Sequence, residues 1–441
     1  MTMDLDAALA WLAGHVNLER EPASRAARRL DRMRRLVGLM GDPQATYPVI
    51  HLTGTNGKGS TARMVTALLG ARGLSVGTYT SPHLERLNER LAWGGLPISD
   101  EDLAGVLSSV ADLELLLDSG HGVQATQARP THFEVLTAAA FRWFADVAVD
   151  VAVVEVGLGG RWDATNVADA AVAVVTNVSL DHAETIGPTL ADIAREKAGI
   201  VKPGSTLVLG ETDPALAGVF KEAPAQEVWE RGRDFDCTTN ALAIGGRAVE
   251  LTTRGGRYAD VFIPAHGAFQ GDNAALALAA SEAFFGGPLD PARVAEGLAS
   301  VRIPGRLEVV ARSPLTILDG AHNPAGAAAA AAAIEEAFGT AVHGRVLVVG
   351  MLEGRDPVAM LEAMRVSSAR LVVACPPPSP RAMSPATVAA TAERLGVRAQ
   401  PLESVGEAVD RALSEATPED LVLVTGSLYV VGAARSRLRV D

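Results

Sequence analysis

The sequence of 441 residues is long enough for two or three domains, and its 48% hydrophobic content supplies material for large cores. A net charge of −13 argues against a partner such as nucleic acid or an anionic membrane. With only two cysteines, a disulfide framework and a thiolate metal cluster are both excluded.

The N-terminal part of the chain has the pattern of an α/β fold. Its first segment carries acidic residues, has no basic run typical of a secretory signal, and is followed by no long apolar span, so we expect a cytoplasmic protein. Apolar runs predict strands, and helical patterns predict helices over 60–73 and 133–146. The predicted strands are 48–52, 75–80, 149–156, 171–178 and 205–210. Val-rich strands alternating with helices indicate a doubly wound, mostly parallel sheet of the P-loop type.

The alternation resumes in the second half of the chain after two interruptions. Short runs broken by Gly-Gly pairs over 228–264 predict a small antiparallel insertion, and a helix is expected over 271–285. A Pro-Gly break then indicates a linker at 302–306. We therefore expect one domain over 1–301 and a smaller, Rossmann-like α/β domain over 307–441. The smaller domain is built from the apolar runs 345–350, 370–375 and 421–432, with helices over 325–338 and 358–365.

A glycine-rich loop follows the first predicted strand and opens a helix. Its residues are Gly54, Thr55, Asn56, Gly57, Lys58, Gly59 and Ser60. The strict phosphate-loop pattern has four residues between its first Gly and the Gly-Lys pair, whereas this loop has two. Free N–H groups at a helix N-terminus still favour an anion. We predict a phosphate cradle, and a glycine turn without a nucleotide is the alternative.

Lysine is rare in this sequence. Among 39 Lys and Arg residues, lysine occurs only at Lys58, Lys197, Lys202 and Lys221. These four lysines are candidates for roles that the guanidinium of arginine cannot fill, such as a compact ammonium group or an amine that loses its proton. Lys58 and Lys197 are the stronger candidates because they lie among other reactive side chains. For Lys202 and Lys221, a functional role and a simple contribution to surface charge are equally good explanations.

Polar side chains follow the predicted strands at the edge where open α/β sheets bind ligands. Ser81 follows one strand, Asp181 and His182 follow another, and Glu155 ends a third. An acid at the end of an apolar strand commonly holds the Mg²⁺ of a bound nucleotide. Because Mg²⁺ prefers oxygen, His182 stays open between a metal ligand and a structural histidine. Asp319 and His322 follow a later strand and reach the same ligand only if the two sheets close over a shared cleft.

A series of segments, in order along nearly the whole chain, resembles the folylpolyglutamate synthase/dihydrofolate synthase family of the Mur ligase superfamily. These segments are GTNGKGS, TSPHL, THFE, EVGLGGRWDATN, TNVSLDH, IAREKAGIVK, GDNAALA, IPGRLE, DGAHNP and GSLYVVG. The resemblance implies an ATP-dependent ligase that forms an amide bond, with two Mg²⁺ ions.

The same resemblance implies roles for individual residues. The glycine loop from Gly54 to Ser60 binds ATP, Ser60 contacts the first Mg²⁺, and Glu155 bridges the metals. Ser81 and His182 bind the second Mg²⁺, which favours the metal role of His182. Lys197 matches a lysine that is carbamylated in the family. Further implied roles are ATP contacts at Asn273, Arg306 and Asp319, catalytic roles at Lys58, Lys197, Asp319 and His322, and a pterin-side pocket at Phe133 and Asp163.

The reaction implied by the resemblance transfers the γ-phosphoryl group of ATP to a carboxylate, after which the amine of L-glutamate displaces phosphate. The acceptor is dihydropteroate, a reduced folate or both, and we favour a monomeric enzyme with both activities. Another Mur-type ligase is the nearest rival, although only 53 residues precede Gly54, fewer than the additional N-terminal domain of such enzymes needs. A nucleotide-dependent switch without ligase activity would not need Lys197 or the DGAHNP segment.

The sequence departs from the family pattern in three places. Trp162 stands where leucine is expected, and residues 354–356 read Gly-Arg-Asp where an Asp-Lys-Asp sequence is usual. Phe269 stands where histidine is expected. We expect the first two departures to affect the selectivity for folate or glutamate more than the chemistry of ATP.

Overall fold

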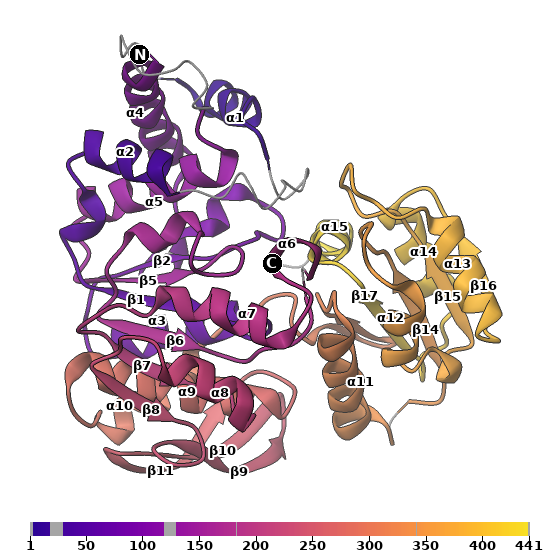
Figure 1. The fold of residues 1–441 in the computed structure, drawn as a ribbon. Coiled ribbons are helices and arrows are strands. Elements are labelled where there is room, and N and C mark those ends of the chain that lie inside the picture. Colours follow the sequence, from indigo (N-terminus) through magenta and orange to yellow (C-terminus); the bar gives the residue numbers. More distant parts are fainter. Residues whose placement is uncertain (1–2, 18–29, 119–128, 182, 341, 440–441) are drawn as a thin grey trace.

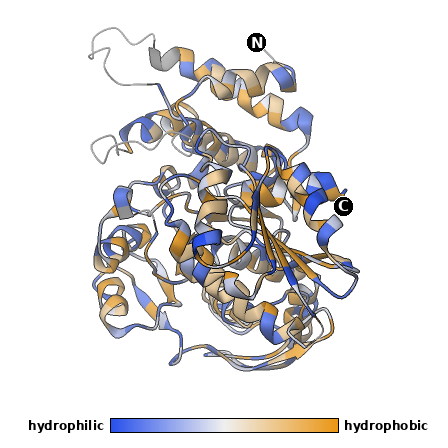
Figure 2. Cartoon of the chain, turned by 90° about the vertical axis from the view of Figure 1, so that its right-hand side faces the viewer, coloured by the Kyte–Doolittle hydropathy of each residue, from blue (hydrophilic) through white to orange (hydrophobic). Residues whose placement is uncertain are grey.

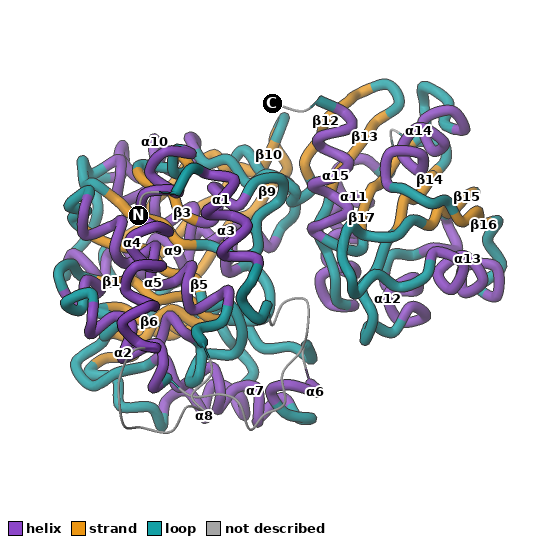
Figure 3. Tube along the Cα trace, turned by 90° about the horizontal axis from the view of Figure 1, so that it is seen from above, coloured by secondary structure: helices purple, strands orange, loops and turns teal. Residues whose placement is uncertain are grey.

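The computed structural model describes residues 3–17, 30–118, 129–181, 183–340 and 342–439, which form two bodies side by side (Figures 1 and 3). The larger body contains an eight-stranded sheet and a three-stranded sheet, and the smaller body contains a six-stranded sheet. Within the described residues, no helix is long and apolar enough to cross a membrane.

The eight-stranded sheet is mainly parallel, with only its β3 and β4 edge antiparallel. The central strands are buried throughout, as expected of a sheet covered on both faces. In spatial order its strands are β4 (Leu96–Pro97), β3 (Leu91–Trp93), β2 (Val76–Tyr79), β5 (Val151–Glu155), β1 (Val49–Thr53), β6 (Val172–Val175), β7 (Thr206–Leu209) and β8 (Glu227–Glu230). The predicted doubly wound sheet is confirmed.

Helices cover both faces of this sheet, and the alternating side chains of β5 show how. Val151 and Val153 pack into the core beneath α3 and α9, whereas Ala152 and Val154 pack into the core beneath α4 and α5. The helices of the larger body are α1 (Leu5–Ala13), α2 (Asp31–Leu39), α3 (Lys58–Ala71), α4 (Asp100–Asp118), α5 (His132–Asp146), α6 (Ala183–Ile186), α7 (Leu190–Lys197), α8 (Pro214–Lys221), α9 (Phe269–Phe285) and α10 (Pro291–Ser300).

The predicted antiparallel insertion is confirmed over 236–263, whereas the start of the predicted range, 228–230, belongs to β8 of the parallel sheet. The insertion is a meander of β9 (Asp236–Ala243), β10 (Gly246–Thr253) and β11 (Gly256–Ile263). The core beneath α3 and α9 includes Leu251 and Val261 of this meander, so one hydrophobic cluster joins both sheets of the larger body.

The six-stranded sheet of the smaller body is parallel except at β12, and its strands are predominantly apolar (Figure 2). The apolar run 421–432 divides between a strand and the start of a helix. In spatial order the strands are β12 (Glu308–Arg312), β13 (Leu315–Leu318), β17 (Leu421–Thr425), β14 (Arg345–Val349), β15 (Leu371–Ala374) and β16 (Ala399–Pro401). The helices are α11 (Pro324–Phe338), α12 (Pro357–Ala363), α13 (Pro385–Arg394), α14 (Val405–Glu415) and α15 (Leu428–Leu438).

Candidate functional site

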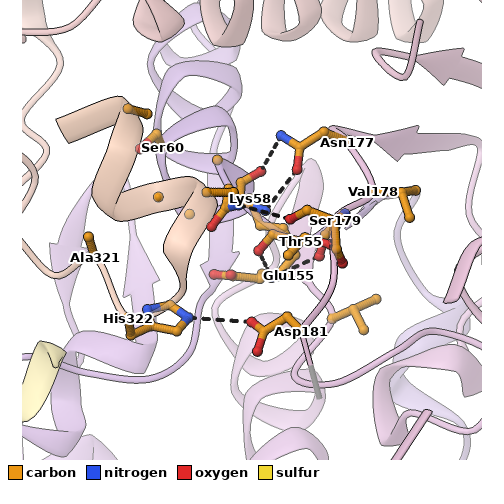
Figure 4. A pocket seen from close by; sticks show the side chains of 18 of the residues that line it. Thr55, Lys58, Ser60, Glu155, Asn177, Val178, Ser179, Asp181, Ala321 and His322 are labelled. Atoms are coloured by element: carbon orange, nitrogen blue, oxygen red, sulfur yellow. Dashed lines mark hydrogen bonds and ion pairs between the residues drawn. The ribbon is translucent and has the colours of Figure 1, made fainter. Parts of the chain in front are cut away.

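The loops after β1, β2, β5 and β6 line a cavity of about 520 Å³ at the carboxyl edge of the large sheet. Parallel strands bring these loops to one edge, where ligands bind in open α/β sheets. The smaller body supplies the other wall through Asp319, His322 and the first turns of α11. Figure 4 shows His322 directed toward Asp181 of the larger body. One cavity therefore receives side chains from both bodies.

The glycine loop has a backbone conformation that suits glycine at two positions. Gly54 has φ of 148° and Gly57 has φ of 86°, values that other residues rarely adopt. A Cβ atom on Gly54 would lie 1.7 Å from Oγ1 of Thr176, and one on Gly57 would lie 2.6 Å from Oδ1 of Asn273. These two glycines allow the loop to pack against its neighbours while its backbone faces the cavity.

The loop is held in place by the segment that follows β6. The N–H of Asn56 donates to Oδ1 of Asn177 (3.0 Å), and the Asn56 carbonyl accepts from the Thr176 hydroxyl (2.7 Å). The N–H of Thr55 donates to the Asn177 carbonyl (2.9 Å). Among the described residues, no side chain caps the N-terminus of α3, which begins at Lys58. Its first N–H groups are thus available to an anion in the cavity.

Two lysine side chains converge on the carbonyl of Gly54. Nζ of Lys58 donates to it at 3.1 Å, and Nζ of Lys197, the last residue of α7, donates at 2.7 Å. Burial, and secondarily the positive charge of Lys58, lowers the pKa of Lys197 to about 7. An amine with this pKa is partly uncharged near neutral pH, which is the form that reacts as a nucleophile.

Glu155 ends β5 with its side chain buried next to the phosphate loop. Its Oε2 accepts from the N–H of Ser81 (3.2 Å), and a Cβ on Gly59 would approach the same oxygen to 3.4 Å. Burial raises the pKa of Glu155, whereas the positive charges of Lys58 and Arg306 act in the opposite direction. A carboxylate in this position is poised to interact with a cation held between it and a bound polyphosphate.

The donor atoms at this place fit Mg²⁺. Ser60 lies buried in the first turn of α3 and lines the cavity together with Ser81 and Glu155. Hydroxyl and carboxylate oxygens are ligands that Mg²⁺ accepts, and it commonly takes the rest of its shell from substrate phosphates and water. The described residues contain no cluster of three or more His, Cys, Asp or Glu side chains arranged for a metal. The remaining predicted ligand, His182, lies outside the described residues.

The smaller body presents Asp319 and His322 after β13. The buried carboxylate of Asp319 accepts from the N–H groups of Leu307 and Ala321, both at 2.9 Å, and so fixes the chain beside Arg306. Burial raises the pKa of Asp319, and the charge of Arg306 opposes this shift. His322 is held by a contact between Nδ1 and the Gly320 carbonyl (3.0 Å). Arg306 and Asn273 also line the cavity.

Comparisons with known proteins agree with this geometry. The model of the Mur ligase middle domain matches residues 52–281, and that of the Mur ligase glutamate ligase domain matches residues 305–428. The dihydrofolate synthase/folylpolyglutamate synthase of Mycobacterium tuberculosis is 39% identical over 96% of this chain and 92% of its own length. The chain belongs to the dihydrofolate synthase/folylpolyglutamate synthase family. It is therefore an ATP-dependent, amide-forming ligase.

Solved structures of the family are similar over the whole chain. Folylpolyglutamate synthase of Mycobacterium tuberculosis, complexed with ADP and AMPPCP, superposes with a TM-score of 0.91 at 38% identity, covering 99% of this chain and all of the other. An FPGS–AMPPCP–folate complex has a TM-score of 0.84 at 32% identity and the same coverage. The fold of this chain is thus that of family members which bind an ATP analogue.

Phe133 and Asp163, which are predicted to form the pterin-side pocket, lie behind the wall of the cavity. The ring of Phe133 packs so closely on Gly157 that a Cβ there would lie 2.4 Å from its Cζ. Asp163 accepts from the N–H groups of Leu158 (2.9 Å) and Thr165 (3.0 Å), so its carboxylate is engaged within its own loop. Both shape the loop after β5 that lines the cavity, and their role in a pterin pocket stays a prediction.

The cavity also contains polar residues for which the sequence predicted no role. Asp181 lies in the loop after β6, at the edge of the sheet where its position after a predicted strand placed it. Asn323 precedes α11 and donates from Nδ2 to Oδ1 of Asn56 at 3.0 Å. This contact joins the two bodies, and no local pattern in the sequence indicates it.

Proposed function

We propose that this ligase adds L-glutamate to dihydropteroate and to the γ-carboxylate of reduced folates. The observation that carries the proposal is the placement of a phosphate loop and of the DGAHNP segment on opposite walls of one cavity. The names of the family relatives support the choice of folates and glutamate as substrates.

The reaction proceeds in two displacements. A carboxylate oxygen of the acceptor attacks the γ-phosphorus of ATP, an O–P bond forms, and ADP leaves. The glutamate amine then attacks the acyl carbon, phosphate leaves with the oxygen that bridged the two groups, and the amine loses a proton. Lys58 and Arg306 supply positive charge where phosphate charge spreads. His322 or Asp319 positions the amine, and closure of the two bodies over the cavity would exclude water from the acyl phosphate.

The proposal includes two Mg²⁺ ions. Ser60 and Glu155 would hold the first, and Ser81, Glu155 and His182 would hold the second. When bound, Mg²⁺ neutralises phosphate charge and orients the phosphate oxygens. The buried position of Glu155 and its contact with the backbone of Ser81 support this placement.

We further propose that Lys197 is carbamylated in the active enzyme. Its uncharged amine attacks CO₂, a C–N bond forms, one N–H proton leaves, and the side chain becomes an anionic carbamate. The lowered pKa supports this reaction, because the neutral amine predominates above about pH 7. Replacement of Lys197 by Arg, which forms no carbamate, is expected to lower kcat about 100-fold.

Bicarbonate dependence checks this prediction. Enzyme depleted of CO₂ should lose activity and regain it when CO₂ is restored, faster at pH 8 than at pH 6 at the same concentration of dissolved CO₂, while the Arg variant should not respond. Lys202→Arg is the matched control, since Lys202 donates to the Asn166 carbonyl (3.2 Å) and lies outside the cavity lining. Full activity of Lys197→Arg would contradict a carbamate.

The proposed function is tested by measuring ADP release with ATP, Mg²⁺, L-glutamate and either dihydropteroate or tetrahydrofolate. Turnover with both acceptors is the expected result. Turnover with one assigns a single activity and directs attention to Trp162, whose side chain is exposed. Absence of turnover with both, in buffer that contains bicarbonate, would refute the assignment to folates.

The remaining parts of the proposal concern organisation and setting. We propose domains over 1–301 and 307–441 with the linker at 302–306, supported by the division of the strands between two bodies. We also propose a cytoplasmic monomer whose partners are small molecules rather than nucleic acid or membrane. The net charge of −13 supports the absence of nucleic-acid and membrane partners. Light scattering of the purified chain tests the monomeric state.

A further inference from the structure

Asp181 lies where the two bodies meet beside the cavity. It belongs to the loop after β6, lines the cavity, and has a side chain that is only 8% exposed. A second ion pair between the bodies, from Arg247 of β10 to Glu336 of α11 (2.8 Å), involves no residue of the cavity lining. Asp181 thus connects the bodies at the cavity itself, whereas Arg247 and Glu336 connect them outside its lining.

The carboxylate of Asp181 receives three groups from the smaller body. Nη1 of Arg355, in the loop before α12, forms a hydrogen-bonded ion pair with Oδ1. Nδ2 of Asn323 donates to Oδ2 at 3.4 Å, and Nε2 of His322 lies 3.6 Å from the same oxygen. A single side chain of the larger body therefore fixes two separate loops of the smaller body.

Asn323 extends this connection to the phosphate loop. Its Oδ1 accepts from the N–H of Gly326 (2.8 Å) and so caps α11, while its Nδ2 also donates to Oδ1 of Asn56 (3.0 Å). The N-terminal turns of α11 line the cavity. The contacts of Asp181 and Asn323 together set the distance between the phosphate loop and the segment that carries His322.

We infer that Asp181 and Arg355 are positioning residues, whose ion pair holds His322 and the start of α11 at the place where the incoming amine meets the activated carboxylate. Arg355 does not line the cavity, so it acts through Asp181. The pair is largely shielded from water, with Arg355 19% exposed and Asp181 8% exposed, so its loss has a larger effect than the loss of an ion pair at the surface. This inference rests on the proposed function.

The test measures ADP and ligated product in the same reaction for Arg355→Gln, which removes the charge and the Nη1 donor of the side chain. The wild-type chain should form equal amounts of both. The variant should lose about 10- to 100-fold in kcat/KM for glutamate, since a small misplacement of reacting groups has effects of this size. It should also release more ADP than product, because water intercepts the waiting acyl phosphate. Arg355→Lys should recover part of both properties.

Glu336→Gln is the matched control, because it removes the ion pair with Arg247 away from the cavity. It should keep equal yields of ADP and product. The inference is overturned if Arg355→Gln retains wild-type kcat/KM and equal yields, or if Glu336→Gln shows the same excess of ADP. Asp181→Asn carries the same expectations and replaces Arg355→Gln if that variant does not fold. Failure of the wild-type chain to turn over folate and glutamate would refute the proposed function instead.

Discussion

Replacement of Lys58 by Gln is expected to lower kcat/KM for ATP about 100- to 1,000-fold, the effect of removing one charged donor from a developing oxyanion. In the structure, Nζ of Lys58 donates to the carbonyls of Gly54 (3.1 Å) and Thr55 (3.3 Å) at the start of α3. Phosphate oxygens are stronger acceptors for an ammonium group than these carbonyls, so the side chain is placed to turn to a bound nucleotide. Steady-state kinetics with varied ATP measures the effect.

Lys221→Gln is the control for this substitution. Lys221 is a lysine at the end of α8 that pairs with Glu230 at the surface and is 46% exposed. Exposed pairs of this kind contribute at most about 1 kcal/mol to stability. Its loss should leave kcat/KM for ATP within about two-fold of the wild-type value. Equal kinetics of Lys58→Gln and the wild-type chain would exclude Lys58 from the phosphate site.

Replacement of Gly54 by Ala should lower kcat/KM for ATP about 100-fold, through displacement of the phosphate loop rather than loss of a functional group. The new Cβ would lie 1.7 Å from Oγ1 and 2.9 Å from Cβ of Thr176, and φ of 148° adds backbone strain. The added Thr176→Ala substitution should restore only part of the activity, since it removes the nearest clashing atom but leaves the strain and deletes the hydrogen bond from Thr176 to the Asn56 carbonyl. Kinetics and thermal unfolding of the single and double variants measure both effects.

Gly70→Ala provides the comparison within the same helix. A Cβ at Gly70 meets no atom within 4 Å, and the position lies inside α3. Alanine there should preserve activity and keep or raise the melting temperature, because it reduces the freedom of the unfolded chain. If Gly54→Ala and Gly70→Ala behaved alike, the tight packing of the loop against Thr176 would have no role in binding ATP.

The parts of the site that the sequence predicted are those determined by local order along the chain. Glu155 ends an apolar strand, and the glycine loop lies between a strand and a helix, so parallel pairing alone brings both to one edge of the sheet. The contacts of Asp181 with Arg355 and of Asn56 with Asn323 depend on how two separate sheets face each other. Periodicity and spacing carry no information about that arrangement.

Two other features, one in each body, were also not determined by the sequence pattern. The apolar run 421–432 contains both β17 and the start of α15, since a buried helix and a buried strand have similar apolar runs. Asp163 has the residue type of a ligand-binding group, yet its carboxylate is engaged by Leu158 and Thr165. The motif around Asp163 indicates that an acidic side chain is needed at this position, and only the structure shows which atoms that side chain contacts.

The most direct test of the central claim follows oxygen from the acceptor carboxylate. Tetrahydrofolate labelled with ¹⁸O in its γ-carboxylate is incubated with the enzyme, ATP, Mg²⁺, bicarbonate and L-glutamate, and mass spectrometry reads both the folate product and the released phosphate. The account predicts that the folate product is longer by one glutamate and that the released phosphate carries one ¹⁸O atom. Phosphate without label, or ADP formed without an extended folate, would contradict ligation through an acyl phosphate.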